Sequence, residues 1–328
     1  MERLDLAEAA ALAQVSTQTL RNFIRSGRLK EYRAGRRIQV DREELQTILD
    51  VHDRARPPAP ALRTPRVFAV CNHKGGVGKT TSASTLGYFL AERGRTLMID
   101  ADPQAHLTQV YGVDSDKLER TLYEVLVKSY PLLDVVRPVL NSPPLECIEN
   151  RQIEEASRSL YLVGSNLELA DTTLQVTGRP WWANLLRNAL RPALEHFDYV
   201  IIDCPPSLDA LTVNAIAAAT DVIVPVDMGA FSLRGTVKLM DIIRHVCDQL
   251  PQPPVHRFLA CRVEPNQFTD DILDQLWRHY GGRVFHTVIR KAVDVSRAQM
   301  YRQPLPVLFP NNLAAQDYAA LAKEMLDE

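Results

Sequence analysis

The chain has 328 residues, of which 46% are hydrophobic and 24% are charged, and its formal net charge is only −2. This composition is typical of globular proteins, and the length is sufficient for two domains. It excludes a wholly disordered chain, a collagen-like repeat and a coiled-coil rod. No apolar run approaches the roughly 18 residues of a membrane-spanning helix, and the N-terminus has no pattern of a secretory signal. With so little net charge, any contact with DNA must depend on local basic patches.

The first predicted domain comprises residues 1–51 and contains short helices and one hairpin. Asp5 and Glu8 form a capping-box pattern that predicts a helix start, and Ala34-Gly35 predicts the turn of the hairpin. Asp41 with Glu44 predicts the start of the last helix. The predicted elements are a helix over 6–14, a helix over 17–25, a hairpin over 29–40 and a helix ending at Asp50.

Residues 20–40 of this first domain are strongly basic, with Glu31 as the one acid among seven basic residues. Such a cluster provides salt-sensitive affinity for phosphates. The side-chain types of the second helix can read base edges in a major groove. The predicted DNA contacts are Gln18, Thr19, Arg21, Asn22, Arg25, Arg36 and Arg37. The whole pattern resembles the winged helix-turn-helix domains of MerR and the excisionases, and a basic protein-docking domain is the alternative.

A proline-rich linker is predicted over residues 52–65, because Pro57, Pro58, Pro60 and Pro65 cannot sustain a helix or a strand ladder. The remaining domain, residues 66–328, alternates short apolar runs with amphipathic stretches. The runs are 67–72, 96–100, 160–165, 199–204, 221–227, 258–263 and 284–289. They predict an α/β fold with a doubly wound, mostly parallel sheet. Ligands of such sheets bind at the carboxyl ends of the strands.

A glycine-rich loop over residues 73–81 follows the first of these runs and precedes a predicted helix that ends at Glu92. A strand, such a loop and a helix together favour phosphate binding, since backbone N–H groups and the helix N-terminus attract anions. Lys79 can neutralise the β- and γ-phosphates, and the Thr80 hydroxyl can bind Mg²⁺. The strict P-loop pattern fails, however, because His73 occupies the position of its first glycine.

Residues 74–81, K-G-G-V-G-K-T-T, resemble the deviant Walker A loop of the ParA/MinD superfamily of P-loop ATPases. Residues 97–104 look like the second-strand motif of that superfamily, and residues 198–207 look like its Walker B strand. Residues 221–226 and 231–235 are similar to the partition branch. The resemblance extends from about Pro65 to the C-terminus.

The resemblance implies that the chain binds ATP and Mg²⁺. The implied phosphate-binding residues are Lys74, Gly75, Gly76, Val77, Gly78, Lys79, Thr80 and Thr81. Lys74 would act in catalysis by reaching the phosphates of the partner subunit in an ATP-bound homodimer, much like an arginine finger. Asp102 would orient or activate the attacking water, while Thr80, Asp100 and Asp203 would hold Mg²⁺, largely through waters.

Two segments depart from the superfamily pattern. Ala105-His106 follow Asp-Pro-Gln where the family commonly has Gly-Asn, and Ile289-Arg290-Lys291 stand where the partition branch often has Ile-Pro-Arg. The second segment helps to enclose the adenine in the family, so the base contacts of this chain are not assigned.

The last part of the sequence is also basic, and the resemblance implies a non-specific DNA surface there, formed across the dimer. Its predicted contacts are Arg290, Lys291 and Arg297, and a scattered solvated face is the alternative. Trp181-Trp182 are expected to pack in the core, and Cys71 and Cys204 to serve as small buried apolar residues. The histidines show no metal-ligand spacing, so no transition metal is expected.

The functional prediction is a ParA-like ATPase for plasmid or chromosome partition. It would be cytoplasmic and nucleoid-associated, dimerise with ATP, bind DNA non-specifically, respond to a ParB-like partner and bind an operator through its first domain. The main alternative is an ATP-tuned transcriptional regulator without a role in segregation. A membrane-positioning protein is disfavoured by the acidic C-terminal helix, an iron-protein-like electron carrier by the cysteine positions, and a metabolic ligase by the DNA-binding head.

Overall fold

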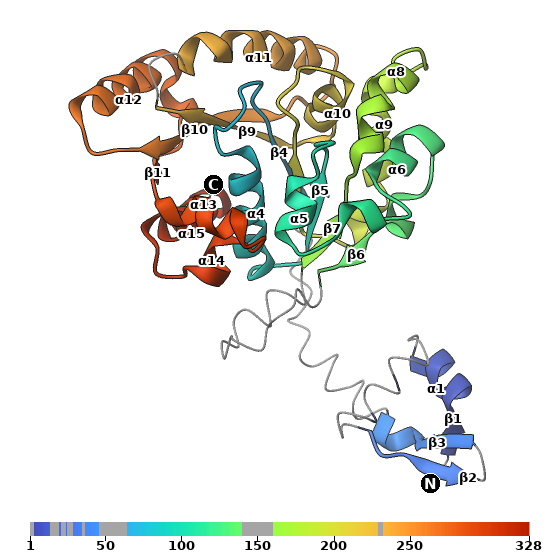
Figure 1. The fold of residues 1–328 in the computed structure, drawn as a ribbon. Helices are drawn as coiled ribbons and strands as arrows, with labels where there is room; N and C mark the ends of the chain where they lie inside the picture. Colours follow the sequence, from blue (N-terminus) through green and yellow to red (C-terminus); the bar gives the residue numbers. More distant parts are fainter. Residues whose placement is uncertain are drawn as a thin grey trace. The chain divides into compact units, whose positions relative to one another are not determined.

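The computed structural model describes residues 3–13, 20, 24, 29–34, 37–45, 64–139, 160–228 and 232–327. The chain divides into two compact units, residues 1–63 and residues 64–328, and each is described by itself (Figure 1). Within the described residues, no helix is both long and apolar enough to cross a membrane.

The first unit contains a three-stranded antiparallel sheet with the strand order β1-β3-β2. Its elements are β1 (Arg3–Asp5), α1 (Leu6–Ala13), β2 (Tyr32–Ala34) and β3 (Arg37–Asp41). The predicted capping box is confirmed, since Asp5 Oδ1 accepts from the Glu8 amide and Glu8 Oε2 accepts from the Asp5 amide. The predicted hairpin is also confirmed as β2 and β3. The pairing of β1 with β3 was not predicted, because three residues are too few for a periodic pattern.

The core of the first unit consists of Ala9, Leu20, Leu29, Val40 and Leu45. Leu20 and Ile24 are helical and both contact this core, as the predicted second helix requires of residues four positions apart. The predicted base-reading residues Gln18, Thr19, Arg21, Asn22 and Arg25, and the predicted phosphate contact Arg36, lie outside the described residues. Arg37 begins β3, and only its backbone is described.

The second unit is built on an eight-stranded sheet with the order β11-β10-β9-β4-β8-β5-β7-β6. All neighbouring strands are parallel except β6 and β7, so the prediction of a doubly wound, mostly parallel sheet is confirmed. The strands are β4 (Arg66–Val70), β5 (Thr96–Asp100), β6 (Arg137–Pro138), β7 (Leu160–Val163), β8 (Tyr199–Asp203), β9 (Asp221–Asp227), β10 (Val255–Val263) and β11 (Ile289–Arg290).

Helices cover both faces of this sheet (Figure 1). One face carries α4 (Lys79–Ala91), α5 (His106–Val110), α13 (Val293–Met300), α14 (Leu305–Leu308) and α15 (Leu313–Leu326). The other carries α6 (Leu122–Lys128), α8 (Thr172–Val176), α9 (Leu185–Leu190), α10 (Ala210–Ala218), α11 (Ser232–Cys247) and α12 (Gln267–Tyr280).

Between their end residues, the central strands β4, β5, β8 and β9 are apolar, because alternate residues pack into two separate cores. In β4, Val67 and Ala69 belong to the core under α10 and α11, whereas Phe68 and Val70 belong to the core under α4 and α15. Such a strand has no polar face, so it reads as a continuous apolar run rather than an alternating one.

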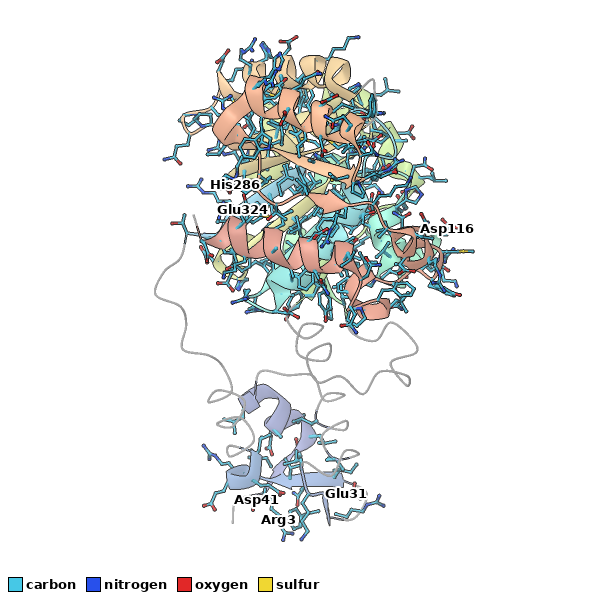
Figure 2. All side chains as sticks on the ribbon, turned by 90° about the vertical axis from the view of Figure 1, so that its left-hand side faces the viewer. Arg3, Glu31, Asp41, Asp116, His286 and Glu324 are labelled. Carbon is cyan, nitrogen blue, oxygen red and sulfur yellow. The ribbon has the colours of Figure 1, made fainter. Side chains whose placement is uncertain are left out.

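The predicted strand over 284–289 is wrong in extent. Val284 makes only an isolated bridge to Phe258, and β11 comprises just Ile289 and Arg290. Between them, the amides of His286 and Thr287 donate to the two carboxylate oxygens of Glu324 in α15, at 2.7 and 2.9 Å (Figure 2). These amides therefore bond to a side chain instead of a neighbouring strand.

The prediction that Trp181-Trp182 pack in the core is wrong for Trp181, which is 80% exposed. Its backbone adopts a left-handed conformation (φ 61°) immediately before the short 3₁₀ helix Trp182–Asn184. This turn points the indole outward, while Trp182 is half-buried and its carbonyl accepts from Asn214 in α10. By contrast, Cys71 and Cys204 are buried in the core, as expected.

Candidate functional site

The glycine-rich loop lies between β4 and α4, at the carboxyl end of a central strand of the sheet. Gly76 and Gly78 have φ angles of +71° and +99°, which side chains strongly disfavour and glycine adopts freely. Gly78 caps α4, and its carbonyl accepts from the Ser82 amide at 2.8 Å. The loop therefore delivers the chain directly into the positively polarised N-terminus of a thirteen-residue helix.

Lys79, the first residue of α4, is almost fully buried. Its Nζ donates to the Lys74 carbonyl of the same loop at 3.0 Å. Burial lowers the pKa of the Lys79 ammonium, and the nearby Asp203 carboxylate acts in the opposite direction. A buried cation with one neutral acceptor has capacity left for an anion.

Asp203, at the end of β8, lies close enough to Lys79 for each charge to act on the pKa of the other. Both of its carboxylate oxygens are buried and have no hydrogen-bond partner within the described residues. Burial, followed by the neighbouring Asp100 carboxylate, raises the pKa of Asp203 well above its usual range, although the Thr80 hydroxyl and the Lys79 ammonium act in the opposite direction. Two buried and unpaired acceptors are expensive for a fold, and a bound cation would satisfy them.

Asp100 lies directly opposite Asp203 in the register of β5 and β8, yet its carboxylate is fully engaged. Oδ2 accepts from the Thr108 amide at 2.8 Å and from the Thr108 hydroxyl at 2.6 Å, and Oδ1 accepts from the Asp102 amide at 3.1 Å. Burial raises the pKa of Asp100 to about 7, despite these hydrogen bonds. Of the two predicted metal carboxylates, Asp203 therefore has the free oxygens, and Asp100 organises the segment after β5.

Asp102 lies in that segment and is also buried. Its Oδ1 accepts from the Gln104 amide at 2.9 Å, and its carbonyl accepts from the Ser165 hydroxyl at 2.7 Å. The amide of Ser165 in turn donates to the Thr108 hydroxyl at 3.0 Å. The chain after β7 thus fixes the backbone around Asp102. Thr108 and Ser165 were not predicted from the sequence, since no motif marks them.

Lys74, near the start of the glycine-rich loop, is held by two contacts. Its amide donates to Asn72 Oδ1 at 3.0 Å, and its Nζ lies 3.4 Å from Asp227 Oδ2. Asp227 is the last residue of β9 and was not singled out from the sequence. Its place at the carboxyl end of a predicted strand was the available signal.

A pocket of about 250 Å³ adjoins the loop on the side of Asp227. Its other lining residues are Met228, Arg262, Glu264, Asn266, Phe268 and Thr269. Arg262 connects the pocket to the loop, because its Nη1 donates to the Gly76 carbonyl at 3.2 Å while its Nε lies 3.8 Å from Asp227 Oδ1. Asp227 and Arg262 therefore both line the pocket and contact residues of the glycine-rich loop.

Comparison with known proteins agrees with this geometry. A family model described as "AAA domain" matches residues 65–253, and one described as "Helix-turn-helix domain" matches residues 3–50. The chromosome partitioning protein ParA of Caulobacter vibrioides is 34% identical over 267 residues, which cover 80% of this chain and 94% of that protein. The chain belongs to the ParA family. The sporulation initiation inhibitor protein Soj of Bacillus subtilis is 30% identical over 266 residues, covering 79% and 98% of the two chains.

A solved structure shares the fold of the second unit. It is named cobyrinic acid a,c-diamide synthase, from Mycobacterium smegmatis, with a bound ATP analogue and magnesium. The identity is 28%, the TM-score is 0.65, and the match covers 80% of this chain and 94% of the other.

Residues in the first turn of α4 connect this ParA-family site to the C-terminal helices by hydrogen bonds. Thr81 Oγ1 accepts from Gln299 of α13 at 2.9 Å, and Ser82 shares a 2.9 Å hydrogen bond with Tyr318 of α15. Thr80, half-buried, precedes them in α4. Gln299 and Tyr318 were not predicted, because they lie more than 200 residues from the loop in sequence.

The late basic residues predicted to contact DNA are each paired with an acid in this ParA-family chain. Arg290 makes several hydrogen bonds to Asp317, including one of 3.0 Å from its own amide. Lys291 pairs with Glu264 at 2.7 Å. Arg297 pairs with Asp294 at 3.0 Å and lies over the Phe309 ring. Of the three, Arg290 is the most firmly bound within its own chain, and this counts against it as a phosphate contact.

Proposed function

We propose that the chain is a ParA-type ATPase that binds Mg-ATP at residues 74–81 and uses the nucleotide to control dimerisation and DNA binding. The observation that carries the proposal is the opposition of Lys79 to Asp203. A buried ammonium at the start of α4 and, near it, a buried carboxylate without hydrogen bonds at the end of β8 match the two halves of a metal–phosphate group. The relative named as a chromosome partitioning protein supports partition as the process served.

The residues fit a magnesium ion because the two buried carboxylate oxygens of Asp203 accept no hydrogen bond within the described residues. No group of three or more His, Cys, Asp or Glu side chains gathers as a metal cage in the described part of the chain. This suits Mg²⁺, which keeps several waters and takes one or two carboxylates together with substrate phosphates. Thr80 and Asp203 would hold it, with Asp100 positioned behind, and the ion would neutralise charge on the β- and γ-phosphate oxygens.

Lys79 and the loop backbone would bind the phosphates, and Asp102 would orient the attacking water and accept its proton. Asp102 suits that task because the hydrogen bonds from Gln104 and Ser165 hold its backbone and one carboxylate oxygen in place. Lys74 would contact the phosphates of the partner subunit in the homodimer. Each subunit would thereby complete the other's site, so hydrolysis would depend on dimerisation.

The helix-turn-helix unit would bind a specific operator or centromere site, and the ATP-bound body would bind DNA without sequence preference. Lys291 and Arg297 are the better placed of the late cations for the second role, since their acidic partners are partly exposed and exchangeable. A ParB-like protein would stimulate hydrolysis and release the DNA. The protein would then work in the cytoplasm, associated with the nucleoid.

Two other functions make different predictions. A transcriptional regulator tuned by ATP would bind its operator through the first unit and show no nucleotide-dependent DNA binding by the body. An amide-forming enzyme, as the name of the Mycobacterium smegmatis relative suggests for that protein, would not require the helix-turn-helix unit that this chain carries.

The deciding experiment measures binding of the body, residues 64–328, to random-sequence duplex DNA with ATP, with ADP and without nucleotide. The body has its own compact fold and cores, so it can be tested alone. ATP-dependent binding that weakens with salt, and that Lys79→Ala abolishes, is the expected result. Absence of binding with every nucleotide would favour the regulator. Calorimetry with ATP on the same samples checks the nucleotide site itself.

A further inference from the structure

Lys74 is the one loop lysine whose proposed task lies outside its own subunit, yet here its ammonium contacts an acid of its own chain. Asp227 Oδ2 lies 3.4 Å from Lys74 Nζ, and the Lys74 side chain is 40% exposed whereas that of Asp227 is 17% exposed. Asp227, at the end of β9, is therefore the more enclosed member of the pair, and the Lys74 side chain is the more accessible to a partner. The ion pair with Asp227 stabilises the position in which the Lys74 side chain lies against its own subunit.

Asp227 also contacts a second cation. Its Oδ1 lies 3.8 Å from Arg262 Nε, and Arg262 Nη1 donates to the Gly76 carbonyl at 3.2 Å. Arg262 has a left-handed backbone with φ of 59°, which is uncommon for a residue with a side chain. One carboxylate thus connects the lysine of the loop, an arginine at the end of β10 and, through that arginine, the loop backbone.

We propose that Asp227 is a positioning residue that holds Lys74 against its own subunit and so sets the threshold for ATP-dependent dimerisation. Lys74 cannot pair with Asp227 and with a phosphate of the partner subunit at once, so dimerisation must break the first contact. This inference rests on the proposed function, since it concerns the lysine assigned to the dimer. No covalent step is involved; one carboxylate is exchanged for a phosphate.

The size of the effect follows from the exposure of the pair. Partly exposed ion pairs are worth a factor of roughly two to five in an equilibrium constant. Each dimer releases two such lysines, so Asp227→Asn should lower the dimer dissociation constant by about four- to 25-fold. Asp227→Glu keeps the charge and should stay near wild type. The neutral and isosteric asparagine preserves the volume at this position.

The test measures dimer dissociation constants by analytical ultracentrifugation of the full chain with a non-hydrolysable ATP analogue. The variants are Asp227→Asn, Asp227→Glu, Lys74→Ala and the double variant Lys74→Ala/Asp227→Asn. Asp241→Asn is the matched control, because it also removes one acid from an arginine ion pair, but on the exposed face of α11. Circular dichroism melts establish that each variant is folded.

Tighter dimerisation with Asp227→Asn, absent in the Lys74→Ala background, is the expected result. The same gain in both backgrounds would assign the effect to general charge and overturn the proposal, as would an unchanged constant for Asp227→Asn. Calorimetry on the wild type distinguishes failure of this inference from failure of the proposed function. If wild type binds the analogue and dimerises but Asp227→Asn matches it, only this inference fails; if wild type binds no analogue, the proposed function fails with it.

Discussion

Two charged regions of the second unit differ in how their charges are balanced. At the phosphate loop, Lys79 has a carbonyl as its acceptor and both oxygens of Asp203 have no partner, although both residues are buried. Around β11 and α13, by contrast, Arg290, Lys291 and Arg297 each contact an acid of the same chain. Among the described residues, the buried Asp203 carboxylate of the phosphate site therefore lacks hydrogen-bonding partners, whereas each of the three C-terminal cations has an ion-pair partner.

The difference indicates which charged groups are suited to bind a ligand. A buried carboxylate without hydrogen bonds destabilises the fold, so such a group is found mainly at functional sites, where ligand binding offsets the loss. A cation paired with its own acid needs no ligand, and it binds phosphate only by giving up that acid. Unsatisfied burial is thus stronger support for a site than a count of charges along the sequence.

The largest expected effect comes from Asp102→Ala. Loss of the group that orients the water should lower the turnover number by about 10²- to 10⁴-fold, while ATP affinity changes little, because Asp102 is not among the proposed phosphate contacts. Phosphate release under single-turnover conditions and calorimetry measure the two quantities. Asp116→Ala, on an exposed 3₁₀ helix (Figure 2), is the control. Normal turnover in the Asp102 variant would place the catalytic group elsewhere.

Asp203→Asn tests the cost of the unpaired carboxylate directly. Removing a buried charge whose oxygens have no hydrogen bonds should raise the free energy of unfolding of the nucleotide-free protein by about 1–3 kcal/mol. That corresponds to an increase in Tm of several degrees for a unit of this size. The same variant should lose the stabilisation that Mg-ATP gives to wild type.

The pH dependence of this gain has a definite sign. The folded-state pKa of Asp203 is raised, so between the unfolded and folded pKa values the folded state binds more protons. Wild-type stability therefore falls as pH rises through that window, and the advantage of Asp203→Asn should be larger at pH 8 than at pH 5. An advantage that shrinks toward pH 8, or a variant less stable than wild type, would mean that attraction to the Lys79 ammonium outweighs the cost of burying the Asp203 carboxylate.

A smaller effect separates Arg290 from its neighbour. Arg290→Ala should lower the free energy of unfolding by about 1 kcal/mol, because it leaves the buried Asp317 carboxylate with fewer donors. Lys291→Ala should change stability by less than about 0.5 kcal/mol and instead reduce the salt dependence of non-specific DNA binding by about one unit of slope. Denaturant titrations and DNA binding at several salt concentrations decide between them. The reverse pattern would make Arg290 the phosphate contact.

Much of this arrangement could be predicted from the sequence, because it depends on local patterns. Buried parallel strands leave continuous apolar runs, and the loop between Cys71 and Lys79 has a glycine wherever the backbone is left-handed. The capping box at Asp5 and the hairpin at Ala34 likewise depend on near neighbours.

The missed features depend on contacts between distant segments. Asp227 is linked to Lys74 across 153 positions and Gln299 to Thr81 across 218, and no spacing rule connects such residues. The error over residues 284–289 has the same origin, since Glu324 takes amides that an isolated β pattern assigns to a strand.

The smallest expected effect concerns Ala105, which follows Asp-Pro-Gln where the superfamily commonly has glycine. Ala105 is buried and caps α5 with φ of 56°, a conformation that costs a residue with a Cβ about 1–2 kcal/mol. Ala105→Gly relieves this strain but forfeits about 0.4–1 kcal/mol of chain entropy and one buried methyl group. These contributions nearly cancel, so stability should stay within about 0.5 kcal/mol of wild type in denaturant titrations. Ala105→Val, whose branched side chain tolerates this backbone least, should lose about 2 kcal/mol or more. Equal stability of the two variants would show that the backbone before α5, where the Ala105 amide donates to the Asp102 carbonyl at 2.9 Å, does not need the left-handed conformation.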